Sequence, residues 1–153
     1  MSDDAARLRV MLPTGEVDVS IARESPADPW ATLVIAHGAG AGYGHPFLVG
    51  FAAGMRAEGV ATVRFNFPYV EAGRRMPGPA AHAIATWQAV MADAAGARHP
   101  VFASGKSYGG RMASMAAAEG VIDPVGLVYL GYPLHAPGKP DKPAVFLVDR
   151  IRD

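Results

Sequence analysis

The clearest chemical signal in this sequence is a serine set between glycines, in the run Gly-Lys-Ser-Tyr-Gly at residues 105–109. An apolar run precedes it and a helix-forming stretch follows it, which is the context of a nucleophile elbow. At such a turn Gly105 and Gly109 let the backbone pass where a Cβ atom would collide. Ser107 then stands at a helix N-terminus, where backbone N–H groups and the helix dipole stabilise a developing oxyanion. The chemistry that this pattern predicts is acyl transfer, with Ser107 as nucleophile.

A glycine-rich stretch at residues 37–44 follows the apolar run 33–36 and supplies a second component of such a site. In esterases, a loop after an early strand donates a backbone N–H group to the oxyanion hole. We predict Ala39 as this donor and the N–H group of Tyr108 as the second donor. His37 is expected to shape the loop through hydrogen bonds rather than to act as a general base.

Two segments resemble phosphate-binding motifs but do not match them. The segment 105–107 looks like the end of a Walker A loop, but Pro100 stands where that motif needs its first glycine. A dinucleotide fingerprint G-x-G-x-x-G fails because Tyr43 and His45 stand where its last glycine should be. The five histidines show no metal-ligand spacing, and the chain has no cysteine. We therefore expect no nucleotide, no metal and no other cofactor.

Composition narrows the remaining classes of partner. The chain has 153 residues, which suits a single domain, and its 14 basic and 14 acidic side chains give a formal net charge of zero. This balance argues against nucleic acid and anionic membranes as partners. The acidic start is followed by no signal-like apolar region, and no apolar segment has the length of a membrane span. A cytoplasmic protein with a small-molecule acyl substrate is the expectation.

The elements that must position these residues follow from the hydrophobic pattern. Apolar residues alternate over 8–12 and 17–21, which predicts an antiparallel hairpin. After it, unbroken apolar runs indicate strands buried on both faces, and segments with apolar residues at helical spacing lie between them. The runs are 33–36, 60–67, 101–103, 126–130 and 144–148, and the helical segments lie at 47–55, 84–91 and 112–116.

This alternation predicts the α/β class, as one domain over residues 1–153 with a doubly wound, mostly parallel sheet behind the N-terminal antiparallel hairpin. In such sheets ligands collect outside the carboxyl ends of the strands. That edge carries residues 37–40, 66–69, Ser107, 131–133 and the segment from Asp149 onward.

Several motifs in order resemble one known group. They are residues 36–42 and 45–47, the segment Arg-Phe-Asn-Phe-Pro-Tyr at 64–69, the elbow through Arg111, and residues 131–140. Together they resemble the KANL/Tex-type family, a dienelactone-hydrolase-like branch of the α/β-hydrolase fold. The resemblance implies a serine hydrolase scaffold, with the nucleophile at Ser107 and the oxyanion loop at Gly38 and Ala39.

The end of the chain departs from this family. The resemblance implies an acid after a late strand and then a histidine on a later loop. Asp153 is the candidate acid, but no histidine follows it, so the domain is expected to be incomplete, with the last strand and helix missing. Alternatively, the tail after Pro140 is unrelated sequence. His135 is the only histidine after the elbow, and it stands where the fold more often places an acid, which makes it a poor candidate base.

Two functions therefore remain open. The first is a serine hydrolase that acts on carboxylic esters or related acyl compounds. The second is a catalytically silent, hydrolase-like module that binds a partner or small ligand in the same cleft. A sheet that ends at the strand 144–148 would also leave an apolar edge, which predicts a homodimer.

Overall fold

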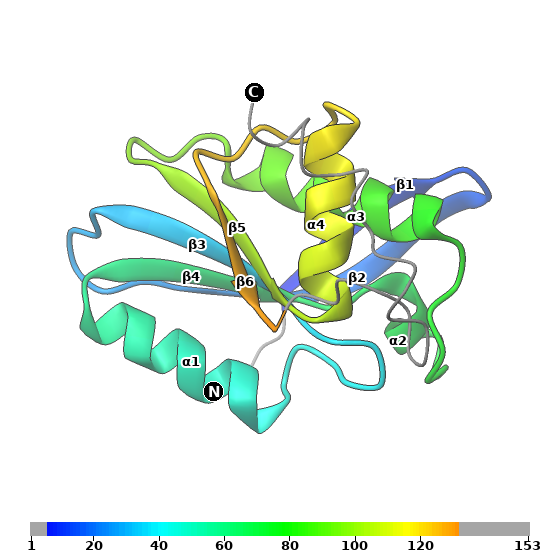
Figure 1. Cartoon of the computed structure of the whole chain (residues 1–153), viewed down its shortest axis with the longest axis horizontal. Helices are drawn as coiled ribbons and strands as arrows, with labels where there is room; N and C mark the ends of the chain where they lie inside the picture. Colours follow the sequence, from blue (N-terminus) through cyan, green and yellow to red (C-terminus); the bar gives the residue numbers. More distant parts are fainter. Residues whose placement is uncertain (1–5, 132–153) are drawn as a thin grey trace, which may run out of the picture.

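A computed structural model of the chain describes residues 6–131, and helices lie on both faces of its central sheet (Figure 1). The elements in chain order are β1 (Ala6–Leu12), β2 (Gly15–Glu24), β3 (Ala31–Ala36), α1 (Pro46–Ala57), β4 (Val60–Phe65), α2 (Pro68–Glu71), α3 (Ala80–Ala94), β5 (Val101–Lys106), α4 (Tyr108–Ala118) and β6 (Leu127–Leu130).

The sheet has six strands in the order β1-β2-β4-β3-β5-β6. β2 pairs antiparallel with both β1 and β4, whereas β3 pairs parallel with β4 and β5, and β5 with β6. This mixed sheet confirms the predicted α/β class, with an antiparallel hairpin ahead of parallel strands. The strand expected over 144–148 lies outside the described residues.

The central strand β3 shows why its sequence is apolar throughout, since every residue of the strand is buried. Alternate side chains of a strand point to opposite faces. Leu33 and Ile35 pack with Leu48 of α1, whereas Val34 and Ala36 belong to the larger core that includes Trp87 of α3 and residues of α4. Figure 1 shows the same division, with α1 on one face and α3 and α4 on the other.

The fourth predicted strand is shorter than expected, and the reason is Pro68. The apolar run 60–67 predicted one strand, but β4 ends at Phe65 and Pro68 begins the short helix α2. Proline lacks the N–H group that a strand ladder needs and suits the first position of a helix. The aromatic residues of this connection therefore leave the sheet at its carboxyl edge, beside the elbow.

Within residues 6–131, no helix combines the length and the apolar character that crossing a membrane requires.

Candidate active site

Ser107 lies on the sharp turn between β5 and α4, in a strained backbone conformation with φ +50° and ψ −110°. Such conformations cost about 1–3 kcal/mol and concentrate at functional sites. The turn is held from both sides, because the Ser107 N–H donates to the Leu130 carbonyl at 3.1 Å and the Ser107 carbonyl accepts from Arg111 N–H at 3.0 Å. The Ser107 hydroxyl makes no capping hydrogen bond to α4. The hydroxyl therefore lies at the start of α4 but does not cap the helix.

The glycines around the turn are required by backbone crowding. A Cβ atom on Gly105 would collide with the backbone of Gly109 and Gly110 at the start of α4. On Gly109 it would stand 2.5 Å from the carbonyl oxygen of His37, and on Gly110 2.8 Å from that of Gly105. The helix thus packs directly against the end of β5 and the start of the loop 37–45. This close approach brings the two sequence motifs together.

His37 anchors the first part of that loop. Its side chain is fully buried, Nδ1–H donates to the Gly38 carbonyl at 2.8 Å, and Nε2 accepts from the backbone N–H of Phe67 at 3.1 Å. Burial lowers the pKa of His37, so the ring is held neutral with both nitrogens engaged. A ring in this state shapes the loop and is not available as the base for Ser107.

Tyr43 anchors the other part of the loop through Arg64 and Asn66, to which the sequence analysis gave no individual role. The Tyr43 N–H donates to Asn66 Oδ1 at 2.8 Å, and its carbonyl accepts from Arg64 Nη1. The Arg64 guanidinium also lies over the Tyr43 ring, 5.6 Å from its centroid. The signals in the sequence were the polar residues Arg64 and Asn66 within the apolar run 60–67 and their place in the motif 64–69.

Asn66 is itself held by Glu71, at the end of α2. Asn66 Nδ2 donates to Glu71 Oε2 at 2.8 Å, and that same oxygen accepts from Ser20 N–H of β2 at 2.8 Å. Arg7 donates to the other carboxylate oxygen at 3.1 Å. Burial alone would raise the pKa of Glu71, but the hydrogen bonds from Asn66 and Ser20 and the charge of Arg7 outweigh it and lower the pKa. The carboxylate therefore stays ionised and braces the loop against the hairpin.

The two predicted oxyanion donors occupy suitable backbone positions. Tyr108 is the first residue of α4, where N–H groups lack partners within the helix. Ala39 lies in a tight turn that the Ala41 N–H closes onto the Gly38 carbonyl at 3.2 Å. Among residues 6–131, neither the Ala39 nor the Tyr108 N–H donates a backbone hydrogen bond. The structure thus places Ser107, Tyr108 and the loop that carries Ala39 at one edge of the sheet, whereas His135 and Asp153 lie outside the described residues.

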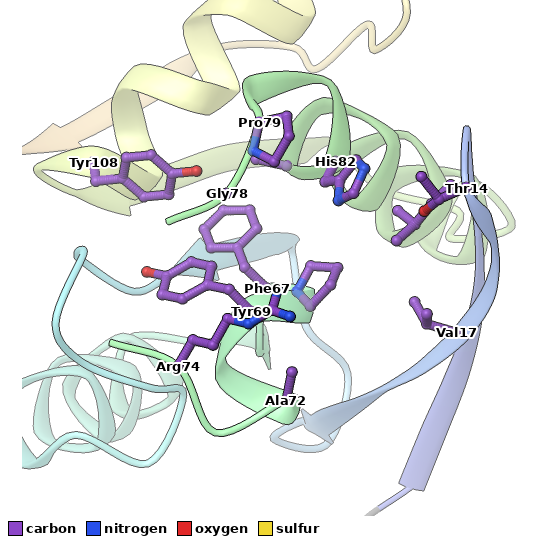
Figure 2. A pocket seen from close by; sticks show the side chains of 13 residues that line it. Thr14, Val17, Phe67, Tyr69, Ala72, Arg74, Gly78, Pro79, His82 and Tyr108 are labelled. Atoms are coloured by element: carbon purple, nitrogen blue, oxygen red, sulfur yellow. The ribbon is translucent and has the colours of Figure 1, made fainter. Parts of the chain in front are cut away.

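A cavity of about 230 Å³ lies beside the elbow, between α2, the start of α3 and the β1–β2 hairpin (Figure 2). Phe67, Tyr69 and Tyr108 line it with their rings. The centroids are 5.5 Å apart for Phe67 and Tyr108 and 6.2 Å apart for Tyr69 and Tyr108, with the rings in edge-to-face contact. The sequence placed residues 66–69 at this edge but gave no sign of a cavity. In the part of the chain that the structure describes, no three histidine or acidic side chains are grouped to hold a metal ion.

Residues 29–151 match a family profile described as "Alpha/beta hydrolase domain". The chain belongs to this α/β-hydrolase family. The match covers the loop, the elbow and the strands that carry them, so the arrangement seen here is that of an α/β-hydrolase. A search of curated proteins finds no significant match.

Solved structures with the same fold include hydrolases from several bacteria. An α/β serine hydrolase without a lid from Xanthomonas campestris is 22% identical with a TM-score of 0.62, over 84% of this chain and 62% of that chain. An α/β serine hydrolase homologue from Coxiella burnetii is 19% identical, with a TM-score of 0.63 over 84% and 64%. A dienelactone hydrolase from Anabaena variabilis is 20% identical, with a TM-score of 0.59 over 85% and 65%. This α/β-hydrolase chain therefore spans less than two thirds of the length of these three structures.

Proposed function

We propose that this α/β-hydrolase chain carries the nucleophile and the oxyanion hole of a serine hydrolase acting on carboxylic esters. The observation that carries the proposal is the strained turn at Ser107, at the N-terminus of α4 and packed against the loop 37–45. Within the family, the motifs at 64–69 and 131–140 favour the KANL/Tex-type, dienelactone-hydrolase-like branch. The names of similar solved structures, which include serine hydrolases and a dienelactone hydrolase, agree with this class.

The proposed reaction has two steps. Ser107 Oγ attacks the ester carbonyl while a base accepts its proton, and the carbonyl oxygen becomes an oxyanion that accepts hydrogen bonds from the N–H groups of Ala39 and Tyr108. Collapse of this intermediate expels the alcohol, which takes the proton from the base, and leaves an acyl-enzyme. Water then attacks the acyl-enzyme in the same way, and the acid leaves with Ser107 restored.

The base and its acid partner lie outside the described residues in this proposal. Asp153 remains the proposed acid, and His135 remains a weaker proposal for the base. A nucleophile and oxyanion hole without a base still accelerate hydrolysis, by roughly a thousandfold over water in a serine protease. Slow hydrolysis by these residues alone is therefore consistent with the proposal.

Covalent labelling tests the nucleophile. The protein is treated with a fluorophosphonate probe and the adduct is located by peptide mass spectrometry. We expect one adduct on Ser107 that disappears in Ser107→Ala and persists in Ser25→Ala, which alters an exposed serine far along the chain. Absence of label on the wild-type protein, or equal labelling of Ser107→Ala, would show that the assignment is wrong.

A binding module without catalysis is the second candidate, because no residue among 6–131 is assigned as the base for Ser107. Both ring nitrogens of His37, whose backbone contacts the elbow, are engaged in hydrogen bonds, so this residue cannot activate Ser107. This candidate predicts ligand binding unaffected by Ser107→Ala and no turnover of esters. Hydrolysis of short acyl esters that depends on Ser107 would exclude it.

A further inference from the structure

Tyr69 carries a buried hydroxyl for which residues 6–131 provide no hydrogen-bond partner. The residue is only 7% exposed. Burial raises the pKa of Tyr69 to about 12, so the hydroxyl is protonated at neutral pH and is able to donate. An unpaired buried hydroxyl destabilises a folded protein, and in native structures such a group usually has a functional reason. The hydroxyl is therefore a candidate contact for a ligand.

The position of Tyr69 connects this hydroxyl to the proposed site. Tyr69 lines the cavity of about 230 Å³ together with Tyr108, the residue that follows Ser107. In Figure 2 the Tyr69 and Tyr108 rings lie at one end of the cavity, and Thr14 and Val17 of the hairpin lie at the other. The donor thus stands at the end of the cavity nearest the elbow.

The rest of the lining describes what the cavity accepts. Apolar side chains form most of the lining. Its polar side chains are Thr14, Arg74, His82 and the two tyrosines, with no aspartate or glutamate among them. The volume is below the roughly 300–1,000 Å³ typical of pockets for larger ligands. The cavity therefore suits a short acyl group that is apolar at its far end.

Resting on the proposed function, we propose that this cavity receives the acyl group of the ester and that the Tyr69 hydroxyl donates a hydrogen bond to an oxygen acceptor near the scissile carbonyl. The substrate class is esters of short alkoxy or oxo acids. A purely aliphatic acyl group would fill the cavity but leave the buried hydroxyl unpaired. Sites built to hydrogen-bond a substrate group discriminate strongly against analogues that lack it.

Paired substrates test this selectivity in the full chain. The 4-nitrophenyl esters of methoxyacetic and butanoic acid have nearly the same shape, and an ether oxygen in one replaces a methylene in the other. We expect Tyr69→Phe to lower the ratio of kcat/KM on the methoxyacetate to kcat/KM on the butanoate at least tenfold, through a larger loss on the methoxyacetate. The intrinsic reactivity of each ester cancels because the same ratio is compared between two proteins. Equal loss on both esters, or an unchanged ratio as expected if only a water pairs with the hydroxyl, would overturn the proposal.

A stability measurement accompanies this comparison, because the two roles of the hydroxyl predict different results. If the Tyr69 hydroxyl serves only the substrate, the unfolding temperature of Tyr69→Phe equals or exceeds that of the wild type. A hydroxyl that supports the fold would instead lower the unfolding temperature, and this result would overturn the proposal.

Binding separates this inference from the proposed hydrolysis. In Ser107→Ala, NMR titration compares N-phenyl methoxyacetamide with N-phenylbutanamide, which do not require turnover. We expect the methoxy amide to bind at least fivefold more tightly, and the addition of Tyr69→Phe to abolish the difference. If the probe does not label Ser107 but the methoxy amide still binds more tightly, the role of the cavity is supported and the proposed hydrolase activity is wrong. If labelling succeeds but neither binding nor kinetics responds to Tyr69→Phe, the cavity inference alone is wrong.

Discussion

The elbow and the loop 37–45 meet at one edge of the sheet, but different parts of the chain determine their shapes. The elbow is local, since Gly105, Gly109 and Gly110 lie within four residues of Ser107 and each gives the backbone room at the turn. The loop is held from a distance, since Asn66 and Arg64 bond Tyr43, and Phe67 bonds His37. A short motif therefore predicts both the place and the shape of the elbow, whereas the glycine-rich stretch predicts the loop but not the side chains that hold it.

The physical difference lies in the kind of interaction. Steric exclusion between backbone atoms acts over a few residues and leaves a glycine at every position where a Cβ atom would collide. Hydrogen bonds from side chains act across the fold and leave only scattered polar residues in the sequence. We expect substitutions to disrupt the elbow by introducing steric clashes and to disrupt the loop by removing hydrogen bonds. The following substitutions test this contrast.

Gly105→Ala is expected to have the largest effect, because its Cβ atom would collide with the backbone of Gly109 and Gly110. We expect a loss of more than about 4 kcal/mol in the free energy of unfolding, enough to unfold much of the protein. Gly40→Ala in the loop is the matched control, since no atom lies within 4 Å of its added Cβ, and its effect is expected within about 0.5 kcal/mol. Urea denaturation measures both, and equal stabilities would refute the steric account of the elbow.

Asn66→Ala tests the long-range support of the loop. It leaves the Tyr43 N–H without its acceptor and removes one of the donors to Glu71, so we expect a loss of about 1–3 kcal/mol in the free energy of unfolding. Hydrogen exchange should show faster exchange at the Tyr43 amide, with little change at the Phe67 amide that bonds to His37. Gln88→Ala, at an exposed amide side chain of α3, controls for removal of an amide group. Unchanged exchange at Tyr43 would mean that other contacts hold the loop.

His37 should make the stability depend on pH. Its pKa is lowered in the folded state from the usual 6.5, so below pH 6.5 the unfolded chain binds a proton that the folded chain excludes. Stability therefore falls as the pH drops from about 6.5 toward the lowered pKa, by at most about 1.4 kcal/mol per pH unit. Urea denaturation between pH 5 and pH 8 should show this slope, and His37→Gln should reduce it. An identical slope in His37→Gln would contradict the buried neutral state.

Ser107→Gly is expected to have the smallest effect, and to stabilise. Glycine adopts a φ of +50° without strain, whereas alanine retains the strain of serine. We expect Ser107→Gly to be about 1 kcal/mol more stable than Ser107→Ala, because the relieved strain exceeds the entropy cost of glycine in the unfolded chain. Thermal unfolding of the two variants measures the difference. If Ser107→Ala is equally stable, the turn stores no strain.

Much of the architecture could be predicted from hydrophobic periodicity. Within residues 6–131, the hairpin, the parallel strands and the three longer helices appear where their patterns place them, except that the strand predicted over 60–67 ends at Phe65. Buried faces require apolar residues at fixed spacing. The short helix α2 was missed, since four residues are too few to show a period. The bracing of Asn66 by Glu71 was missed because its residues lie on separate elements whose contacts no spacing reveals.

The sequence by itself determined the turn at Ser107 and the strand that leads into it, because each depends on backbone sterics or on burial within a few neighbouring residues. Only the tertiary structure decided that His37 is locked in place and that Arg64 and Asn66 hold the loop. It also decided that Tyr69 lines a cavity and that its hydroxyl has no hydrogen-bond partner among residues 6–131. These properties depend on which side chains come into contact across the fold and on how far each is buried from water. A linear pattern of residue types contains neither quantity.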